Sequence, residues 1–187
     1  MVLTKPQGRW RYEDLFDLPV DRRYEIIDGE LYEMPAPRLS HQLTLMNLVG
    51  LFSPVVVALG GYVLAAPVDV FVAGANPVQP DLMIVLPDRL EIMTERGLDG
   101  PPSLVVEILS PSNPERDLIK KQNLYAGAGI PEYWLVDIEL AMIEVLVLDG
   151  GAYRSHVRAT GDQAVTSLVL PHLAFPAAAA FARLPIR

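Results

Sequence analysis

The chain has 187 residues, of which 51% are hydrophobic and 20% charged, a composition typical of a folded protein with one buried core. We therefore expect a single domain spanning residues 1–187. Its 23 acidic residues outnumber the 15 Lys and Arg, which gives a formal net charge of −8. This balance argues against a protein that coats nucleic acid through bulk positive charge, but it allows a local basic groove or a metal-loaded acidic site.

The sequence contains no cysteine, which excludes disulfides, thiolate zinc sites and a cysteine nucleophile. Residues 1–10 lack the continuous apolar segment of a secretory signal, so we expect a cytoplasmic protein. The uncharged run at residues 39–68 is long enough to span a membrane. Its internal prolines and glycines, and the lack of a flanking basic cluster, favour a buried soluble helix followed by a strand, with no membrane partner.

The first half of the chain predicts a hairpin, a long helix and several strands. The hairpin covers residues 24–34, with Asp28-Gly29 as its two-residue turn. The helix is predicted to be capped by Ser40, disturbed at Pro54 and finished near residues 60–61, with an apolar face made of Leu43, Met46 and Val49. Strands are expected next, at residues 62–66, 68–73 and 80–86. A mobile or partly helical connection should follow at residues 90–102.

The second half of the chain predicts a strand, helix, strand unit followed by a hairpin. Residues 103–109 are almost wholly apolar, which is typical of a central strand buried on both faces. After a loop at residues 110–114, a helix is expected from about Glu115 to Ala128, closed by glycines. The remaining predicted elements are a strand at 132–137, a hairpin at 142–157 and a short terminal helix at 174–183. This order indicates an α/β or α+β sandwich.

The helix predicted after residue 114 carries two adjacent lysines that fall on opposite faces. Taking Asp117 as zero and advancing about 100° per residue, the apolar face is centred near 40°. Lys121 falls at about 40° and Lys120 at about 300°, so Lys121 should point inward and Lys120 outward. A buried ammonium needs an acidic partner, because burial of an isolated charge costs several kcal/mol. The candidate partners are Glu107, near the end of the buried strand, and Asp81, which follows Pro80.

Two acids and a lysine that converge at strand ends can hold Mg²⁺ beside a phosphate and orient a water for attack. A structural salt bridge at a helix–sheet contact explains the same spacing equally well. Signals for other chemistry are weak: the sequence has no P-loop or dinucleotide fingerprint, and Ser110 lacks the flanking glycines of a nucleophile elbow.

Several linked blocks of the sequence resemble the Uma-type family of restriction-endonuclease-like proteins, within the PD-(D/E)XK nuclease superfamily. The blocks are Pro80-Asp81, Val106–Ser112, Asp117–Tyr125 and Gly129–Asp137. With the hairpin at residues 24–34, the likeness covers well over half of the chain. It implies a restriction-endonuclease-like mixed β-sheet flanked by helices, with N-terminal and C-terminal β-hairpins, and a homo-oligomer that is a dimer or larger.

The resemblance also implies a catalytic site. Mg²⁺, or Mn²⁺ in its place, would be held by Asp81, Glu107 and the backbone carbonyl of Ile108, while Lys121 positions or activates the water and stabilises charge at the scissile phosphate. In the usual superfamily pattern the lysine lies two residues after the second acid, where this chain has Leu109. The family pattern supplies the lysine from the following helix instead, which is the lysine that the helical geometry selects.

Three other residues are candidates to extend this site. His41 and Glu30 match family positions and could contribute to the metal or phosphate site. His41 could instead be a surface or capping residue, and Glu30 a solvated strand residue. Tyr125 lies on the Lys121 face and could hydrogen-bond the site, although a core role is favoured.

The leading hypothesis is a Mg²⁺- or Mn²⁺-dependent endonuclease that hydrolyses phosphodiester bonds in DNA. One alternative is a non-catalytic binding or assembly module that retains the nuclease fold, which the acidic composition favours. The other is a metal-dependent hydrolase of small phosphodiesters, which would suit the modest number of basic residues.

Overall fold

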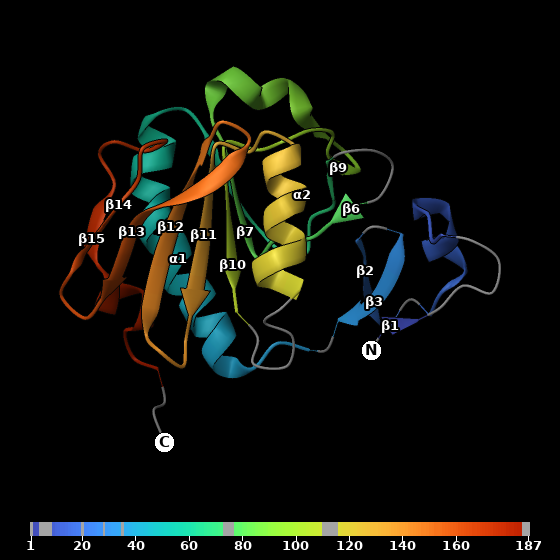
Figure 1. Ribbon diagram of the computed structural model, residues 1–187, viewed down its shortest axis with the longest axis horizontal. Coiled ribbons are helices and arrows are strands. Elements are labelled where there is room, and N and C mark those ends of the chain that lie inside the picture. The colour runs from blue at the N-terminus through green and yellow to red at the C-terminus, as the bar shows by residue number, and fades with distance from the viewer. Residues whose placement is uncertain are drawn as a thin grey trace.

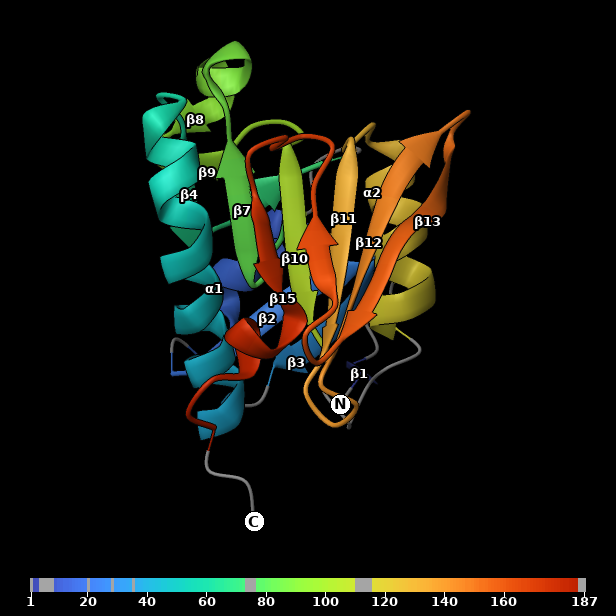
Figure 2. The same ribbon diagram turned by 90° about the vertical axis from the view of Figure 1, so that its left-hand side faces the viewer.

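The computed structural model describes residues 2–3, 9–19, 21–27, 29–34, 36–72, 77–109 and 116–184. A six-stranded mixed sheet lies between helix α1 (Leu39–Ala58) on one face and helix α2 (Gln122–Gly127) on the other (Figures 1 and 2). The strand order across the sheet is β13 (Ala152–Thr160), β12 (Met142–Asp149), β11 (Glu132–Asp137), β10 (Leu104–Ile108), β7 (Leu82–Val85) and β4 (Tyr62–Ala65). Mixed α+β architecture, as expected from the sequence, is confirmed.

Strand β10 occupies the interior of this sheet, as its apolar sequence predicts. All five of its residues are buried. It pairs in parallel with β11 and antiparallel with β7, and the helical segment that contains α2 connects β10 to β11. Side chains alternate between the two faces: Val106 and Ile108 join the core beneath α1, whereas Val105 joins the core beneath α2.

The two predicted hairpins are confirmed. Strands β2 (Arg23–Ile27) and β3 (Glu30–Met34) pair antiparallel, and β1 (Val2–Leu3) adds to β3. Gly29, in the turn, has φ = 77°, a left-handed conformation that glycine adopts without steric cost. The β12–β13 pair forms the second hairpin around glycines 150 and 151, which also have positive φ.

A small four-stranded sheet replaces two of the predicted features. It contains β5 (Val70–Phe71), β6 (Pro77–Val78), β8 (Met93–Thr94) and β9 (Gly97–Leu98). The strand predicted at residues 68–73 is thus only two residues long where it is described. The connection expected at 90–102 contains the end of a 3₁₀ turn (Pro87–Ile92) and an ordered β8–β9 hairpin. Pairing of β9 with β5, which is distant in sequence, determines this structure.

Helix α1 differs from its predicted start and its predicted buried face. Arg38 is the N-cap, so Ser40 lies inside the first turn, and the helix continues through Pro54. Its buried residues are Thr44, Leu45, Leu48, Phe52 and Val56. Met46 is 60% exposed, so the predicted face was wrong. The helix is apolar all round, and periodicity therefore could not identify the side that packs on the sheet.

Length and composition make α1 the one helix in the described part of the chain that could cross a membrane. A helix in the core of a globular protein passes the same test. One side of α1 contributes Leu48, Phe52 and Val56 to the core that it forms with the sheet.

The helix predicted from residue 115 begins, as far as it is described, with a π-helical turn (Arg116–Lys121) and continues as α2. Residues 110–115, which include the predicted loop and Glu115, lie outside the described residues. Lys121 is 1% exposed and the Lys120 side chain 41% exposed. The predicted inward and outward directions of the two lysines are confirmed.

The C-terminal segment predicted as a helix at residues 174–183 begins as a strand. Strands β14 (Ala164–Thr166) and β15 (Ala174–Pro176) pair antiparallel, and a 3₁₀ turn (Ala177–Phe181) follows. Phe175 is buried with Trp134, at a ring-centroid distance of 6.1 Å. This tertiary contact places the first three residues in extended backbone.

Glu132, at the start of β11, is a buried carboxylate that anchors the C-terminal segment to the sheet. Its Oε1 accepts hydrogen bonds from Trp134 Nε1 (2.6 Å) and Ser167 Oγ (2.7 Å). Its Oε2 accepts from the backbone N–H groups of Leu168 (2.8 Å) and Val169 (3.2 Å). Four donors thus surround one anion that has no exposed surface.

The Glu132→Gln variant should lower the free energy of unfolding by about 1–3 kcal/mol, because the amide NH₂ replaces an acceptor and must face buried donors. Urea unfolding followed by circular dichroism measures this change. The matched control is Glu144→Gln, at a partly exposed β12 position, for which we expect less than about 0.5 kcal/mol. Equal unfolding midpoints for the two variants would show that the four bonds do not stabilise the fold.

Candidate functional site

Asp81 and Glu107 lie at facing positions on adjacent strands. Leu82 of β7 pairs with Val106 of β10 in an antiparallel register. Continuing that register by one residue brings Asp81 opposite Glu107, and residues directly opposite share one face of the sheet. The Oδ2 atom of Asp81 accepts the backbone N–H of Ile108 at 2.8 Å. The two acids predicted from the sequence are therefore held together at one end of the central strands.

Lys121 reaches Glu107 from the helical segment above this face. Its Nζ lies 2.8 Å and 2.9 Å from the two Glu107 carboxylate oxygens, and 3.0 Å from Oε1 of Glu25. Tyr125, one helical turn further on, donates its hydroxyl to Glu107 Oε1 at 2.6 Å. Glu25, Glu107, Lys121 and Tyr125 form what we call the lysine cluster, and none of the four is more than 3% exposed.

Glu25 is the member of the lysine cluster that sequence reasoning missed. It lies on β2, where alternation places its side chain on the same side as Ile27. Since Ile27 is buried, that alternation was an available signal for an inward acid. Glu25 Oε1 also accepts the backbone N–H of Gln79 at 2.9 Å. Its Oε2 is buried and has no hydrogen-bond partner among the described residues.

The site carries excess negative charge. Two carboxylates, from Glu25 and Glu107, contact the single ammonium of Lys121, and a third, from Asp81, lies opposite Glu107 on the neighbouring strand. Burial, followed by the negative charges of Glu107 and Glu25, raises the pKa of Tyr125 well above its ordinary value. The phenol therefore remains protonated and acts as a donor to Glu107.

His41, in the first turn of α1, meets the site at Asp81. Its Nε2 lies 3.2 Å from Asp81 Oδ2, and both side chains are mostly buried. The other ring nitrogen, Nδ1, is buried with no partner among the described residues. His41, one of the two residues that match family positions, is thus in direct contact with Asp81, a predicted metal ligand.

Glu30 lies beside the lysine cluster but bonds the outward lysine. Its Oε2 accepts from Lys120 Nζ (3.0 Å) and from the Tyr32 hydroxyl (2.5 Å). The Tyr32 hydrogen bond, with the Lys120 hydrogen bond and charge, lowers the pKa of Glu30. The hydrogen bond of Lys120 to the Tyr32 hydroxyl, followed by its hydrogen bond to Glu30, raises the pKa of Lys120. The pair is half-exposed, so solvent screens it more strongly than the buried Lys121 pairs.

The carboxylates of the site could bind a divalent cation that keeps several of its waters. They could not enclose a cation with protein ligands alone. No three His, Asp or Glu side chains are grouped to enclose a metal in the parts of the chain that the structure describes. Mg²⁺, however, usually keeps several waters and needs only one or two carboxylates. Such an ion could bind between Asp81 and Glu107, which face each other. Glu25 Oε2, which has no hydrogen-bond partner among the described residues, adds negative charge nearby.

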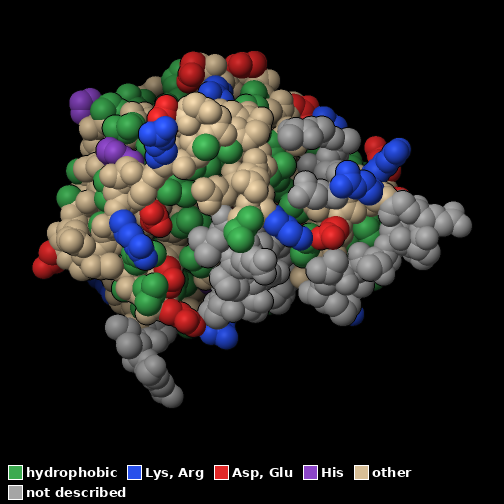
Figure 3. All heavy atoms as spheres, in the orientation of Figure 1, with side chains coloured by type: hydrophobic (Ala, Val, Ile, Leu, Met, Phe, Trp, Pro, Cys, Tyr) green, Lys and Arg blue, Asp and Glu red, His purple; other side chains and the backbone are tan. Residues whose placement is uncertain are grey.

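The molecular surface in view offers no broad basic area. Figure 3 shows Lys and Arg side chains interspersed with Asp and Glu. Among the described residues, Arg22 pairs with Glu33 and Arg96 with Asp99. On this face (Figure 3), recognition of an anionic polymer would depend on local groups more than on a broad basic area.

Comparisons with known proteins agree with the fold and with one broad class of activity. The model of the Uma2 family, described as "Putative restriction endonuclease", matches residues 12–179. The chain also resembles the crystal structure of "a putative nuclease belonging to DUF820" from Anabaena variabilis. The TM-score is 0.74 at 18% sequence identity, over 91% of this chain and 97% of the other. A search of curated proteins finds no significant match.

Proposed function

The chain belongs to the Uma2 family, and on that premise we propose that it is a metal-dependent endonuclease that hydrolyses phosphodiester bonds in DNA. The observation that carries the proposal is the buried Lys121 ammonium held against Glu107, beside Asp81 on the neighbouring strand. A purely structural ion pair needs one acid for one lysine. Here two acids, Glu25 and Glu107, contact the lysine and Asp81 lies opposite Glu107, and this excess of acids suits a site that also binds a cation.

Asp81 and Glu107 are the proposed ligands of Mg²⁺ or Mn²⁺, with the backbone carbonyl of Ile108 as a third. The bound ion would polarise the scissile phosphate and lower the pKa of a coordinated water. The Ile108 N–H bond fixes the orientation of Asp81. Tyr125 likewise holds one oxygen of Glu107 and orients that carboxylate.

Lys121 is the proposed electrostatic catalyst. Its positive charge would stabilise the negative charge that grows on a non-bridging phosphate oxygen in the transition state. The water oxygen bonds to phosphorus while the P–O bond to the leaving strand breaks. Glu25 Oε2, which lacks a donor among the described residues, is the carboxylate available to accept the proton of the water.

His41 and Glu30 have supporting roles in this proposal. His41 Nε2 lies 3.2 Å from Asp81 Oδ2 and would help orient that proposed ligand. Glu30 holds Lys120 at the outer side of the same helical segment and would help keep that segment in place beside the lysine cluster. A homo-oligomer would allow two such sites to cut two strands.

A cleavage panel tests the proposal. Wild-type protein, with Mg²⁺ or Mn²⁺, should cut at least one of supercoiled, linear, branched or single-stranded DNA, and Glu107→Gln should abolish that cutting. The matched control, Glu144→Gln on β12, should cut like the wild type. If the folded wild-type protein cuts no DNA, a non-catalytic binding module is favoured. In such a module Glu107 would be structural, because Lys121 and Tyr125 already donate hydrogen bonds to its carboxylate oxygens. Hydrolysis of small phosphodiesters without cleavage of any DNA favours a hydrolase of small phosphodiesters.

A further inference from the structure

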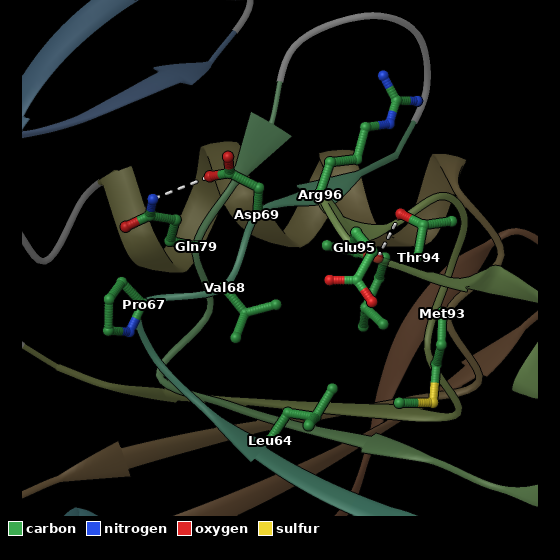
Figure 4. A pocket seen from close by; sticks show the side chains of 11 residues that line it. Leu64, Pro67, Val68, Asp69, Gln79, Met93, Thr94, Glu95 and Arg96 are labelled. Atoms are coloured by element: carbon green, nitrogen blue, oxygen red, sulfur yellow. Dashed lines mark hydrogen bonds between the residues drawn. The ribbon is translucent and has the colours of Figure 1, made fainter.

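A separate cavity opens beside the proposed catalytic site. Its volume is about 400 Å³, within the range of small-ligand pockets. It is enclosed by β4, the connection from β4 to β5, the residue after β6 and the β8–β9 hairpin. Figure 4 shows Leu64, Val68 and Met93 directed into a common space, with Asp69 and Gln79 on one side of it.

This cavity lies on the same face of the central sheet as the lysine cluster. Leu64 pairs with Met83, and Met83 pairs with Val105, so the three side chains form one row across three strands. Glu107 is two residues beyond Val105 on β10. Strand spacing and rise per residue place the Cα atoms of Leu64 and Glu107 roughly 12 Å apart. A DNA strand with its phosphate at Lys121 would therefore extend over the cavity within a few nucleotides.

Gln79 connects the cavity to the lysine cluster. Its backbone N–H donates to Glu25 Oε1 at 2.9 Å, while its side-chain amide donates to Asp69 Oδ1, also at 2.9 Å. Two residues further along the chain is Asp81, a proposed metal ligand. The wall of the cavity and the acids of the catalytic site are thus parts of one short segment.

The polar groups of the cavity are suited to an uncharged ligand that donates hydrogen bonds. Asp69 and Glu95 supply carboxylate acceptors between the apolar side chains. Arg96 points away from the space in Figure 4. It pairs with Asp99 at 2.7 Å and lies over the Phe71 ring at 4.3 Å. An anionic phosphate would be repelled here, whereas a flat base with an amino group would meet apolar walls and acceptors.

Asp69 is held rigidly enough to read such a group. Its backbone carbonyl accepts the N–H of Leu98 at 2.8 Å. Gly97 packs directly against the backbone of Asp69. A Cβ atom at position 97 would lie only 2.2 Å from the Asp69 carbonyl oxygen, so no larger residue fits there. Gln79 donates to Oδ1, so Oδ2 is the oxygen of Asp69 left to accept a hydrogen bond from a ligand. A fixed acceptor discriminates better than a mobile one because little ordering is needed on binding.

We propose that this cavity accepts an unstacked nucleobase with an exocyclic amino group, from the DNA strand whose phosphate lies at Lys121. This inference rests on the proposed nuclease function and adds a base-selective subsite to it. Asp69 Oδ2 accepts the amino N–H, and the faces of the base contact Leu64, Val68 and Met93. Single-stranded or distorted DNA is the preferred substrate, because extracting a base from an intact stack costs free energy.

Two measurements with cytosine and uracil test the proposal. Cytosine carries an amino group at C4 and an acceptor at N3, whereas uracil carries a carbonyl at C4 and an N–H at N3, so only cytosine offers an exocyclic amino donor. Deoxycytidine, but not deoxyuridine, should raise the melting temperature of the wild-type protein. In a one-pot competition with Mg²⁺, single-stranded oligonucleotides rich in deoxycytidine should be cut about tenfold faster than those rich in deoxyuridine.

Two variants and a matched control separate base reading from a structural effect. Asp69→Asn preserves the shape but replaces an acceptor with a donor, so the cleavage preference should be lost or reversed. Val68→Phe fills the cavity and should remove both the thermal shift and the preference. Asp88→Asn, a carboxylate-to-amide change at an exposed position in the 3₁₀ turn and outside the cavity, should leave both unchanged.

The outcomes distinguish the two proposals. Cleavage without base preference, together with no nucleoside-induced thermal shift, overturns the base-binding subsite and leaves the nuclease intact. A deoxycytidine-specific thermal shift without cleavage of any DNA overturns the nuclease and leaves a base-binding cavity. An equal response of wild type and Asp69→Asn in both measurements overturns the role of Asp69.

Discussion

Replacing Lys121 with alanine is expected to reduce DNA cleavage by about 10²- to 10³-fold and to lower the free energy of unfolding by about 3–5 kcal/mol. The first effect follows from loss of the ammonium beside the scissile phosphate. The second follows because Glu25 and Glu107 would remain buried without the cation that pairs with both of them. No other described residue combines these two roles.

The adjacent lysine provides the matched control for this experiment. Lys120→Ala removes the same side chain one position earlier, where the ammonium is half-exposed and bonds Glu30 and Tyr32. It should cost less than about 1 kcal/mol of stability and leave the cleavage rate within a few-fold of the wild type. Lys121→Met retains most of the side-chain volume and tests whether loss of activity follows loss of charge in a folded protein. Cleavage by folded Lys121→Met at the wild-type rate would refute the catalytic role of the lysine.

Mg²⁺ is expected to stabilise the wild-type protein by about 2.7 kcal/mol at a concentration one hundred times its dissociation constant. The physical reason is that the acids of the site outnumber its buried ammonium, so a bound cation reduces repulsion in the folded state only. Thermal unfolding in EDTA and in increasing Mg²⁺ measures the effect. It requires no knowledge of the DNA substrate.

Asp81→Asn should remove most of this metal-dependent stabilisation. Asparagine retains an oxygen that can accept the Ile108 N–H, so the variant is expected to fold while it lacks the negative charge of a ligand. Asp88→Asn, at an exposed position in the 3₁₀ turn, is the matched control and should respond to Mg²⁺ like the wild type. An unchanged Mg²⁺ response in Asp81→Asn would place the cation elsewhere or indicate non-specific screening.

The lysine cluster has the arrangement expected when a buried charge is retained for function. Replacing a buried ion pair with apolar residues is often neutral or stabilising, so stability alone gives little reason to keep it. The cluster lies near one end of β10, beside the apolar core beneath α2, where an apolar side chain would pack readily. Its position at a strand end beside Asp81 accounts for charged residues there.

Local patterns in the sequence determined the elements and the direction of the key lysine. The β2–β3 and β12–β13 hairpins follow from turn glycines between β-prone runs, and the buried β10 follows from its continuous apolar residues. The inward Lys121 and outward Lys120 follow from the helical period of 3.6 residues. Each of these properties depends on neighbours within a few residues along the chain, so one sequence contains the information needed to predict it.

Only the tertiary structure decided which distant groups meet. Glu25 reaches Lys121 because β2 packs beside the main sheet, and the cavity forms because β9 pairs with β5. The buried side of α1 was likewise chosen by the sheet, since the helix is apolar on every side. These contacts join segments tens of residues apart, and their free energy comes from mutual burial. That quantity is a property of the assembled fold, which neither periodicity nor local propensity along the chain contains.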